Sequence, residues 1–154
     1  MPDATIAAAR DIVGDSLAEL RTAVESCTVE QLNRRPAGDD TNGLAVLVTH
    51  TLHSTRAWLS LAVGAPLPDR DRPAEFVVVV EDPAAFLATF DEFAADCRAL
   101  LDADAPFEPA RSGTAPWRAG DRAREPVTAA WALLHAIAHL REHVGHAQLT
   151  RQVV

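Results

Sequence analysis

The chain has 154 residues, of which 48% are hydrophobic, and this suits a single globular domain over residues 1–154. A net charge of −8 at pH 7 argues against a nucleic-acid partner, because binding to phosphates requires clustered positive charge. No apolar run approaches the ~18 residues of a membrane span, and the N-terminal residues lack the pattern of a signal peptide, so we expect a cytoplasmic protein without a membrane partner.

The first half of the chain contains two segments whose apolar spacing predicts long helices. The first covers residues 3–27, where apolar side chains recur at helical intervals. Thr28 and Gln31 form a capping box, which predicts a short helical turn. The second long helix is expected to begin near Asn42, a possible N-cap, and to end at Gly64, a typical C-terminal stop.

The second half alternates two loops with two further helices. Prolines in residues 65–83 exclude a regular helix, and we expect FVVVV in this segment to be an extended crossover and not part of a sheet. Asp82, followed by proline, opens the third helix. Residues 102–126 form a long irregular loop of the kind that often acts as a lid, and the fourth helix follows it directly. Cys27 and Cys97 are expected to be buried thiols within helices.

These four long helices with two long connections predict an all-α fold, a four-helix bundle. Neither an internal repeat nor a domain boundary is visible in the sequence.

Histidines gather on two of the predicted helices. Four of the six lie in the last helix, at positions 135, 139, 143 and 146. At roughly 100° of rotation per residue they fall at about 0°, 40°, 80° and 20°, so they form one stripe on one face. The other two, His50 and His53, lie in the second helix.

This pattern favours a metal site over buried histidines that are merely hydrogen-bonded. Two histidines four residues apart can chelate one ion, and the pattern HxxxH occurs twice in overlap, with His139 in both pairs. A third ligand would come from His50 or His53. Three protein ligands with open positions are typical of a catalytic site, and imidazole suits Zn, Ni, Fe or Cu. Without a metal, many buried donors and acceptors would need other partners.

Several side chains near the stripe could each have one of two roles. Gly145 would allow a neighbouring helix to pack closely, or a substrate to approach. Glu142 could orient a ligand imidazole or act as a base, or it could be an ordinary surface residue. Arg56, Arg141 and Trp58 could bind an anionic substrate, although surface arginines are common.

Two segments resemble the DinB/YfiT-like superfamily. TVEQLNRRPAGDDTNGLAVLVTHTLHSTRAWL, residues 28–59, is similar to the N-terminal half of that family, and LLHAIAHLREHVGHAQLTR, residues 133–151, is similar to its last helix. The resemblance implies a bundle of up-down-down-up connectivity with long connections between the second and third and the third and fourth helices. It also implies a homodimer and a divalent metal held by three histidines.

Carried over by position, the resemblance assigns the metal ligands to His50, His139 and His143. Some relatives have glutamate where His139 stands. Four further side chains would line or support the site without being ligands: His53, His135, Glu142 and His146.

The resemblance also implies an activity. Characterised relatives include mycothiol-dependent maleylpyruvate isomerase and mycothiol or bacillithiol S-transferases. The expected function is therefore that of a thiol-dependent transferase or isomerase, in which zinc or nickel activates mycothiol or a related small thiol towards an electrophile that enters beneath residues 103–126. The alternative is a non-catalytic metal-binding or stress-related bundle that acts through a protein partner. No catalytic residue is assigned from the sequence.

Overall fold

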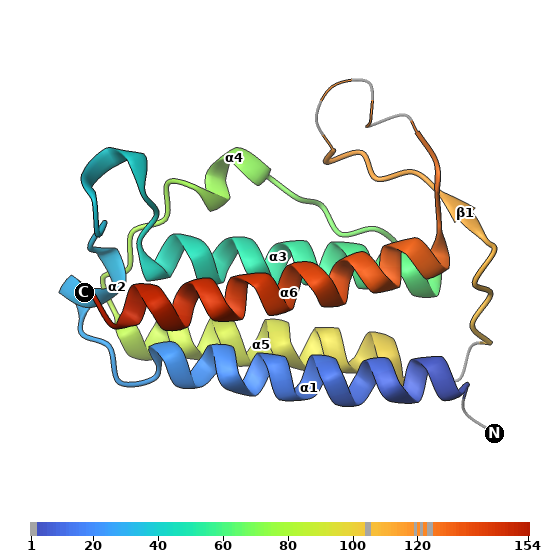
Figure 1. The fold of residues 1–154 in the computed structure, drawn as a ribbon, viewed down its shortest axis with the longest axis horizontal. Coiled ribbons are helices and arrows are strands. Elements are labelled where there is room, and N and C mark those ends of the chain that lie inside the picture. Colours follow the sequence, from blue (N-terminus) through green and yellow to red (C-terminus); the bar gives the residue numbers. More distant parts are fainter. Residues whose placement is uncertain (1–2, 104–105, 119, 121, 123–124) are drawn as a thin grey trace.

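The computed structural model describes residues 3–103, 106–118, 120, 122 and 125–154. Four long helices account for most of these residues: α1 (Ala4–Val24), α3 (Leu44–Val63), α5 (Pro83–Asp102) and α6 (Ala129–Arg151). The shorter elements are α2 (Val29–Asn33), the 3-10 turn η1 (Gly38–Asp40), α4 (Arg72–Glu75) and an antiparallel pair of strands, β1 (Ser112–Gly113) and β2 (Val127–Thr128). The predicted all-α four-helix bundle is confirmed (Figure 1).

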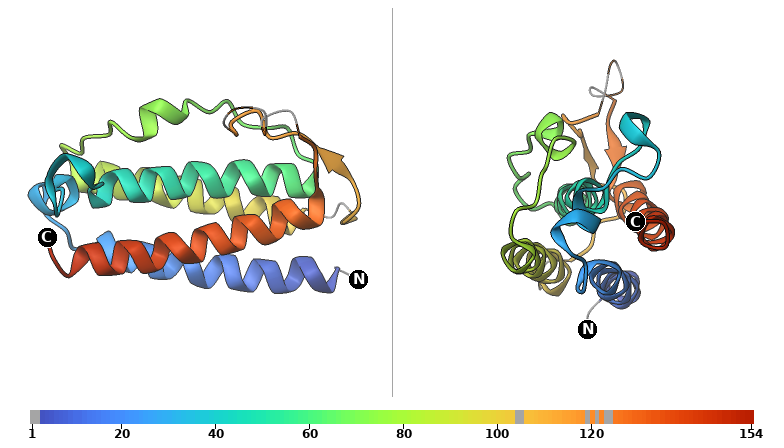
Figure 2. Two further views of the ribbon diagram at one scale, coloured as in Figure 1. Left: turned by 45° about the horizontal axis from the view of Figure 1, so that its top comes forward. Right: turned by 90° about the vertical axis from the view of Figure 1, so that its left-hand side faces the viewer.

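The four long helices run up, down, down and up, as the colours of Figure 1 show. α1 and α6 run in one direction, and α3 and α5 run in the other. Ring contacts agree: His50 of α3 meets His143 of α6, whereas Trp58, two turns later in α3, meets Trp131, three turns earlier in α6. Viewed end-on, α3 lies between α6 and α5 (Figure 2). Because α3 and α5 are parallel, the segment that connects the end of α3 to the start of α5 must run back along the length of the bundle.

The helix ends follow local signals in most cases. Thr28 and Gln31 form the predicted capping box, and the Asp82 side chain accepts a hydrogen bond from the backbone N–H of Ala84 at 2.9 Å. Gly64 ends α3 in the left-handed conformation with φ 77°. This conformation favours glycine, because a Cβ would be strained there.

The predicted N-cap at Asn42 is wrong by one residue. Gly43 is the N-cap of α3 and offers no side-chain cap. A Cβ at Gly43 would lie 3.0–3.1 Å from the backbone carbonyl oxygens of Leu32, Asn33 and Arg34. The close approach of the end of α2 therefore explains why the N-cap position is a glycine. Capping preferences alone do not reveal this contact.

The return connection, residues 64–82, runs along the outer side of α3 (Figure 2). Residues 76–80 of this connection form no strand, as predicted, but the connection also contains α4, which the prolines were expected to exclude. Pro73 is tolerated because it lies in the first turn of α4, where its missing N–H costs no helical hydrogen bond. Asn33 fastens the connection by bonding both the N–H and the carbonyl of Val80, at 2.8 and 2.7 Å.

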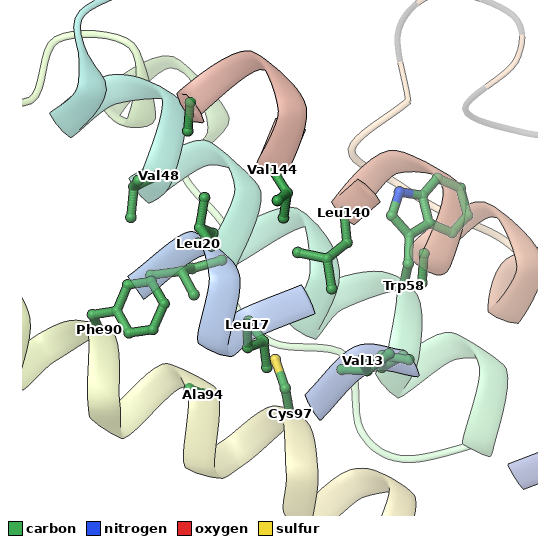
Figure 3. Packing of buried hydrophobic residues seen from close by; sticks show 14 of the residues in the cluster. Val13, Leu17, Leu20, Val48, Trp58, Phe90, Ala94, Cys97, Leu140 and Val144 are labelled. Atoms are coloured by element: carbon green, nitrogen blue, oxygen red, sulfur yellow. The ribbon is translucent and has the colours of Figure 1, made fainter. Parts of the chain in front are cut away.

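The core lies between the four long helices (Figure 3). Its side chains come from every long helix and include Val13, Leu17, Leu20, Val48, Phe90, Cys97, Leu140 and Val144. Both cysteines are buried and free, as predicted. Cys97 lies within α5 as expected, but the prediction that Cys27 lies in a helix is wrong, because α1 ends at Val24. Among the described helices, none is long and apolar enough to cross a membrane.

The loop between α5 and α6 is fastened to the end of α3. The Arg111 guanidinium donates hydrogen bonds to the carbonyls of Leu61 and Ala62 at 2.6 and 2.9 Å. β1 packs so closely that a Cβ at Gly113 would lie 2.6 Å from the Leu61 side chain. The predicted lid is only partly described, because residues 104–105, 119, 121 and 123–124 of this loop lie outside the described residues.

Candidate metal centre

Three histidines from two antiparallel helices converge at one point. His50 of α3 and His139 and His143 of α6 each offer a ring nitrogen, and these three atoms lie within 4.8 Å of one another. The Nε2 atoms of His139 and His143 are 3.2 Å apart. With metal–nitrogen bonds of about 2.0–2.1 Å, two ligands of a tetrahedral site would be separated by ~3.3 Å. The donor set and its spacing therefore fit a divalent transition metal.

The positions of these histidines follow from helix geometry and from the pairing of α3 with α6. The spacing of four residues places His139 and His143 one above the other, with ring centroids 4.4 Å apart. His50 faces both rings from α3 at 5.2 and 5.3 Å. Only 8% of its surface is exposed, so the group lies at the buried α3–α6 seam.

A buried carboxylate orients the His50 ring. Glu75 of α4 has its Oε2 2.8 Å from Nδ1 of His50, which leaves Nε2 of His50 as the atom free to coordinate. The same carboxylate accepts two hydrogen bonds from Arg70, at 2.6 and 2.9 Å. The Glu75 and Arg70 side chains are only 2% and 4% exposed. A carboxylate behind a ligand histidine fixes its tautomer and ring orientation.

Neither Glu75 nor Arg70 was singled out from the sequence. They lie in a proline-rich connection without helical periodicity. One signal was available, since Asp71 accepts a hydrogen bond from Ala74 N–H at the start of α4 and Pro73 follows it. That is the pattern of an acidic cap with a nearby proline that predicted the start of α5, and it would have predicted the start of a short helix here.

Burial controls the charge of the site. It lowers the pKa of His139 to about 3, with a further contribution from the neighbouring histidines, and it lowers the pKa of His143 to about 4. Burial by itself would raise the pKa of Glu75, but hydrogen bonds from His50 and Arg70 outweigh it and lower that pKa to about 2. At neutral pH, His139 and His143 are therefore neutral imidazoles, the form that binds metals, next to an ionised carboxylate.

The rings of His139 and His143 have no fixed orienting partner comparable to Glu75. Their Nδ1 atoms are buried and lack a hydrogen-bond partner among the residues that the structure describes. His50 is thus the ligand candidate whose orientation is set by a protein carboxylate.

The four predicted supporting side chains lie in different surroundings. His135 stacks on Trp131 with ring centroids 4.7 Å apart, and the exposed His146 lies 6.1 Å from His143. His53 packs against Phe93 of α5 at 4.5 Å and lies outside the three-histidine group. Glu142 is exposed, and within the described part of the chain it makes no hydrogen bond to a histidine. The carboxylate that supports a ligand candidate is Glu75, which lies 2.8 Å from His50.

A cavity of about 390 Å³ opens beside the histidines, and His50 and His139 form part of its wall. Trp58 of α3, Trp131 of α6 and Trp117 of the α5–α6 loop also line it. The Trp58 ring meets the other two edge-on at 5.3 and 5.4 Å. The structure thus places an aromatic chamber next to the candidate metal position.

Arg56 and Arg141 are surface arginines and do not line the cavity beside the histidines. Arg56 pairs with Asp96 of α5 at 3.3 Å, and Arg141 pairs with Glu19 of α1 at 3.0 Å. Their side chains therefore point along other seams of the bundle, and of the three residues considered for anion binding, only Trp58 lines the cavity. Close packing is not the reason for Gly145 either, because a Cβ there would meet no described atom within 4 Å.

Two solved structures share this fold. A conserved protein from Enterococcus faecalis superposes with a TM-score of 0.73 at 19% sequence identity, covering 100% of this chain and 98% of that one. YfiT from Bacillus subtilis, described as a probable metal-dependent hydrolase with an unusual four-helix bundle topology, gives a TM-score of 0.70 at 20% identity, covering 99% and 89%. At such identities the likeness shows the fold alone. A comparison with curated proteins finds no match.

The sequence also matches a family model. The model describes the DinB superfamily, and the match covers residues 14–147, which include all four long helices in whole or in part and all three converging histidines. This chain belongs to the DinB superfamily.

Proposed function

We propose that the protein binds one divalent metal ion through His50, His139 and His143 and uses it in catalysis. The observation that carries the proposal is the convergence of three imidazoles within 4.8 Å at the seam between α3 and α6. Zinc and nickel are the proposed metals, because both suit imidazole ligands.

The cavity supports a catalytic role over a purely structural one. Structural zinc sites are closed by four protein ligands, whereas catalytic sites keep a position open. The group contains three ligand candidates among the described residues, and two of them line a cavity. A metal bound there would act as a Lewis acid that lowers the pKa of a thiol or a water molecule entering from the cavity.

We further propose that the nucleophile is a small thiol, such as mycothiol, and that the reaction is a transfer to an electrophile or an isomerisation. The basis is the likeness of residues 28–59 and 133–151 to the DinB/YfiT-like superfamily, whose characterised members include thiol-dependent enzymes. The protein's own thiols do not compete, because both are buried in the core and burial raises the pKa of Cys97 to about 12. The homodimer that the family resemblance implies remains a prediction.

The side chains around the site have defined tasks in this proposal. Glu75 holds the His50 ring so that Nε2 faces His139 and His143, and Arg70 keeps the Glu75 carboxylate ionised. Trp58 and Trp131 wall off the cavity and exclude water from the reacting groups.

Hydrolysis is the second candidate, favoured by the shared fold with YfiT. A hydrolase needs an activated water and commonly a nearby carboxylate as base. No aspartate or glutamate lines the cavity within the described residues, and Glu75 is committed to His50 and Arg70. Thiol chemistry does not require such a carboxylate base from the protein, so we rank it first.

Metal analysis of the purified protein tests the proposal. We expect about one equivalent of zinc or nickel per chain, lost in His139→Ala and retained in the control His146→Ala, whose exposed histidine lies on the same helix. A metal-free wild type whose stability is unchanged by EDTA would refute the site.

Activity assays then separate the two reactions. Loss of free mycothiol in the presence of electrophiles is measured beside hydrolysis of model esters and amides. Either activity should disappear in His139→Ala and persist in His146→Ala. Metal binding with neither activity would favour the non-catalytic alternative.

A further inference from the structure

The cavity beside the three histidines has an unusual charge for this protein. Its charged lining side chains are Arg70, Arg72, Arg118 and Arg122, and within the described residues no carboxylate joins them. The chain as a whole carries a net charge of −8. The other large cavities are balanced: one is lined by Arg56 together with Asp96, and another by Arg151 together with Glu19.

Two of these arginines are not paired with a carboxylate among the described residues. Arg70 is committed to Glu75. Arg72 and Arg118, by contrast, have no carboxylate within 4.0 Å in the part of the chain that is described. The Nη1 atom of Arg118 is buried and has no hydrogen-bond partner there. A buried guanidinium nitrogen without a partner is costly, and an anionic group in the cavity would satisfy it.

The guanidinium groups are held in place by aromatic rings. Arg118 lies over the Trp131 ring at 5.4 Å, Arg72 over Phe76 at 5.2 Å and Arg70 over Trp117 at 5.9 Å. Such cation–π contacts restrict long flexible side chains, so less freedom is lost when a ligand binds.

Apart from Ser54 and the arginines, the cavity wall consists of histidine and tryptophan rings. All three tryptophans of the chain line it, and Trp58 meets both others edge-on. Their rings offer flat apolar surfaces that an inorganic ion would leave unused but a planar organic group would cover.

We propose that this cavity binds an organic anion, with its carboxylate or phosphate on Arg72 and Arg118 and its apolar body among the three tryptophans. The inference rests on the proposed function for the reaction itself, because His50 and His139 line the same cavity and a bound anion would lie beside the open metal positions. It names the class of substrate: an organic acid or a phosphate ester with a planar or apolar body.

Intrinsic fluorescence tests the proposal directly. All three tryptophans line the cavity and the chain has no tyrosine, so the signal excited at the red edge of tryptophan absorption reports on this cavity. The full-length protein is titrated with phenylacetate, with phenyl phosphate and with neutral phenylacetamide, before and after removal of metal by EDTA.

We expect saturable binding of an anion in both metal states, with phenylacetamide at least about tenfold weaker. The tighter of phenylacetate and phenyl phosphate identifies the head group. Arg72→Gln and Arg118→Gln should each lower the affinity for the anion by about tenfold or more, which is the contribution of one charge-assisted hydrogen bond. Arg141→Gln is the matched control, because it makes the same charge change on α6 but pairs with Glu19 of α1. Circular dichroism checks that each variant folds. Because Arg72 is exposed, Arg72→Gln is expected to fold and can be tested even if Arg118→Gln does not fold.

Three results would overturn the inference. One is equal binding of phenylacetate, phenyl phosphate and phenylacetamide. Another is an equal loss in Arg141→Gln, which would indicate net charge alone. The third is anion binding that is lost after EDTA treatment but is unchanged in Arg72→Gln and Arg118→Gln, which would mean that the metal holds the anion. Failure of the metal site itself would be seen separately in the metal analysis, because anion binding is also measured without metal.

Discussion

Glu75 keeps a full negative charge inside the protein while it holds His50 in position. Burial opposes that charge, but Arg70 and His50 donate three hydrogen bonds to the carboxylate and lower its pKa to about 2. A buried carboxylate is retained only where such partners compensate for its lost hydration. This arrangement makes Glu75 a positioning residue for the candidate metal centre.

The variant Glu75→Gln should weaken metal binding by about 10–100-fold, the usual effect of losing an orienting partner behind a ligand. The neutral amide can still accept a bond from His50, but it stabilises the ring less. Affinity is measured by competition with a chromogenic chelator. Glu142→Gln is the control, since it removes the same charge from an exposed position one residue before His143. Equal affinity in Glu75→Gln and wild type would show that Glu75 does not position a ligand.

At the scale of the element, α1 and α6 each contain a glycine that no packing contact requires. A Cβ at Gly14 or Gly145 would meet no described atom within 4 Å. Glycine in a helix interior costs ~1 kcal/mol relative to alanine. Gly64 differs, because its φ of 77° lies in the left-handed region and a Cβ there would lie 3.1 Å from the Arg111 guanidinium.

The same substitution should therefore act in opposite directions. Gly14→Ala and Gly145→Ala are expected to raise the free energy of unfolding by about 1 kcal/mol each, whereas Gly64→Ala should lower it by about 1–2 kcal/mol. Urea denaturation followed by circular dichroism measures all three. A destabilised Gly145→Ala would mean that another molecule packs against this face of α6.

For the whole molecule, the site makes stability depend on pH in the metal-free state. The pKa values of His139 and His143 in the folded protein are lowered to about 3 and about 4, whereas histidine in the unfolded chain titrates near ~6.5. Between these values the unfolded chain binds more protons, so stability falls as the pH is lowered. Glu75 acts in the same direction at lower pH, because its contribution is lost as the pH falls from the unfolded pKa, about 4.5, towards the folded pKa, about 2.

Unfolding in urea with EDTA should therefore show a free energy that decreases steadily from about pH 6.5 to pH 4. The double variant His139→Gln, His143→Gln should reduce that dependence, and His146→Gln, which changes an exposed histidine on the same helix, should leave it in place. A wild-type profile that is flat over this range would contradict the burial of neutral imidazoles at the α3–α6 seam.

Local interactions account for what the sequence by itself determined. The apolar spacing, the Thr28 capping box and the proline after Asp82 depend on residues within one or two helical turns. They predicted the four long helices and the short helix α2. The stripe of histidines on α6 is equally local, since a helical period of 3.6 residues places positions four apart on one face. The topology and the choice of His50 came from resemblance to a family and not from spacing.

Only the tertiary structure decided what surrounds the histidines. His50 and His53 are both compatible with the helical pattern, but the rotation of α3 between α6 and α5 turns His50 towards His139 and His53 towards Phe93. Glu75 and the cavity arginines Arg72 and Arg118 come from connections that carry no periodic signal, and they reach the site because those connections lie against α3 and α6. Their positions depend on contacts between segments far apart in the chain. The spacing of residues along one helix cannot encode such contacts, so the sequence located the candidate metal site while the fold supplied its surroundings.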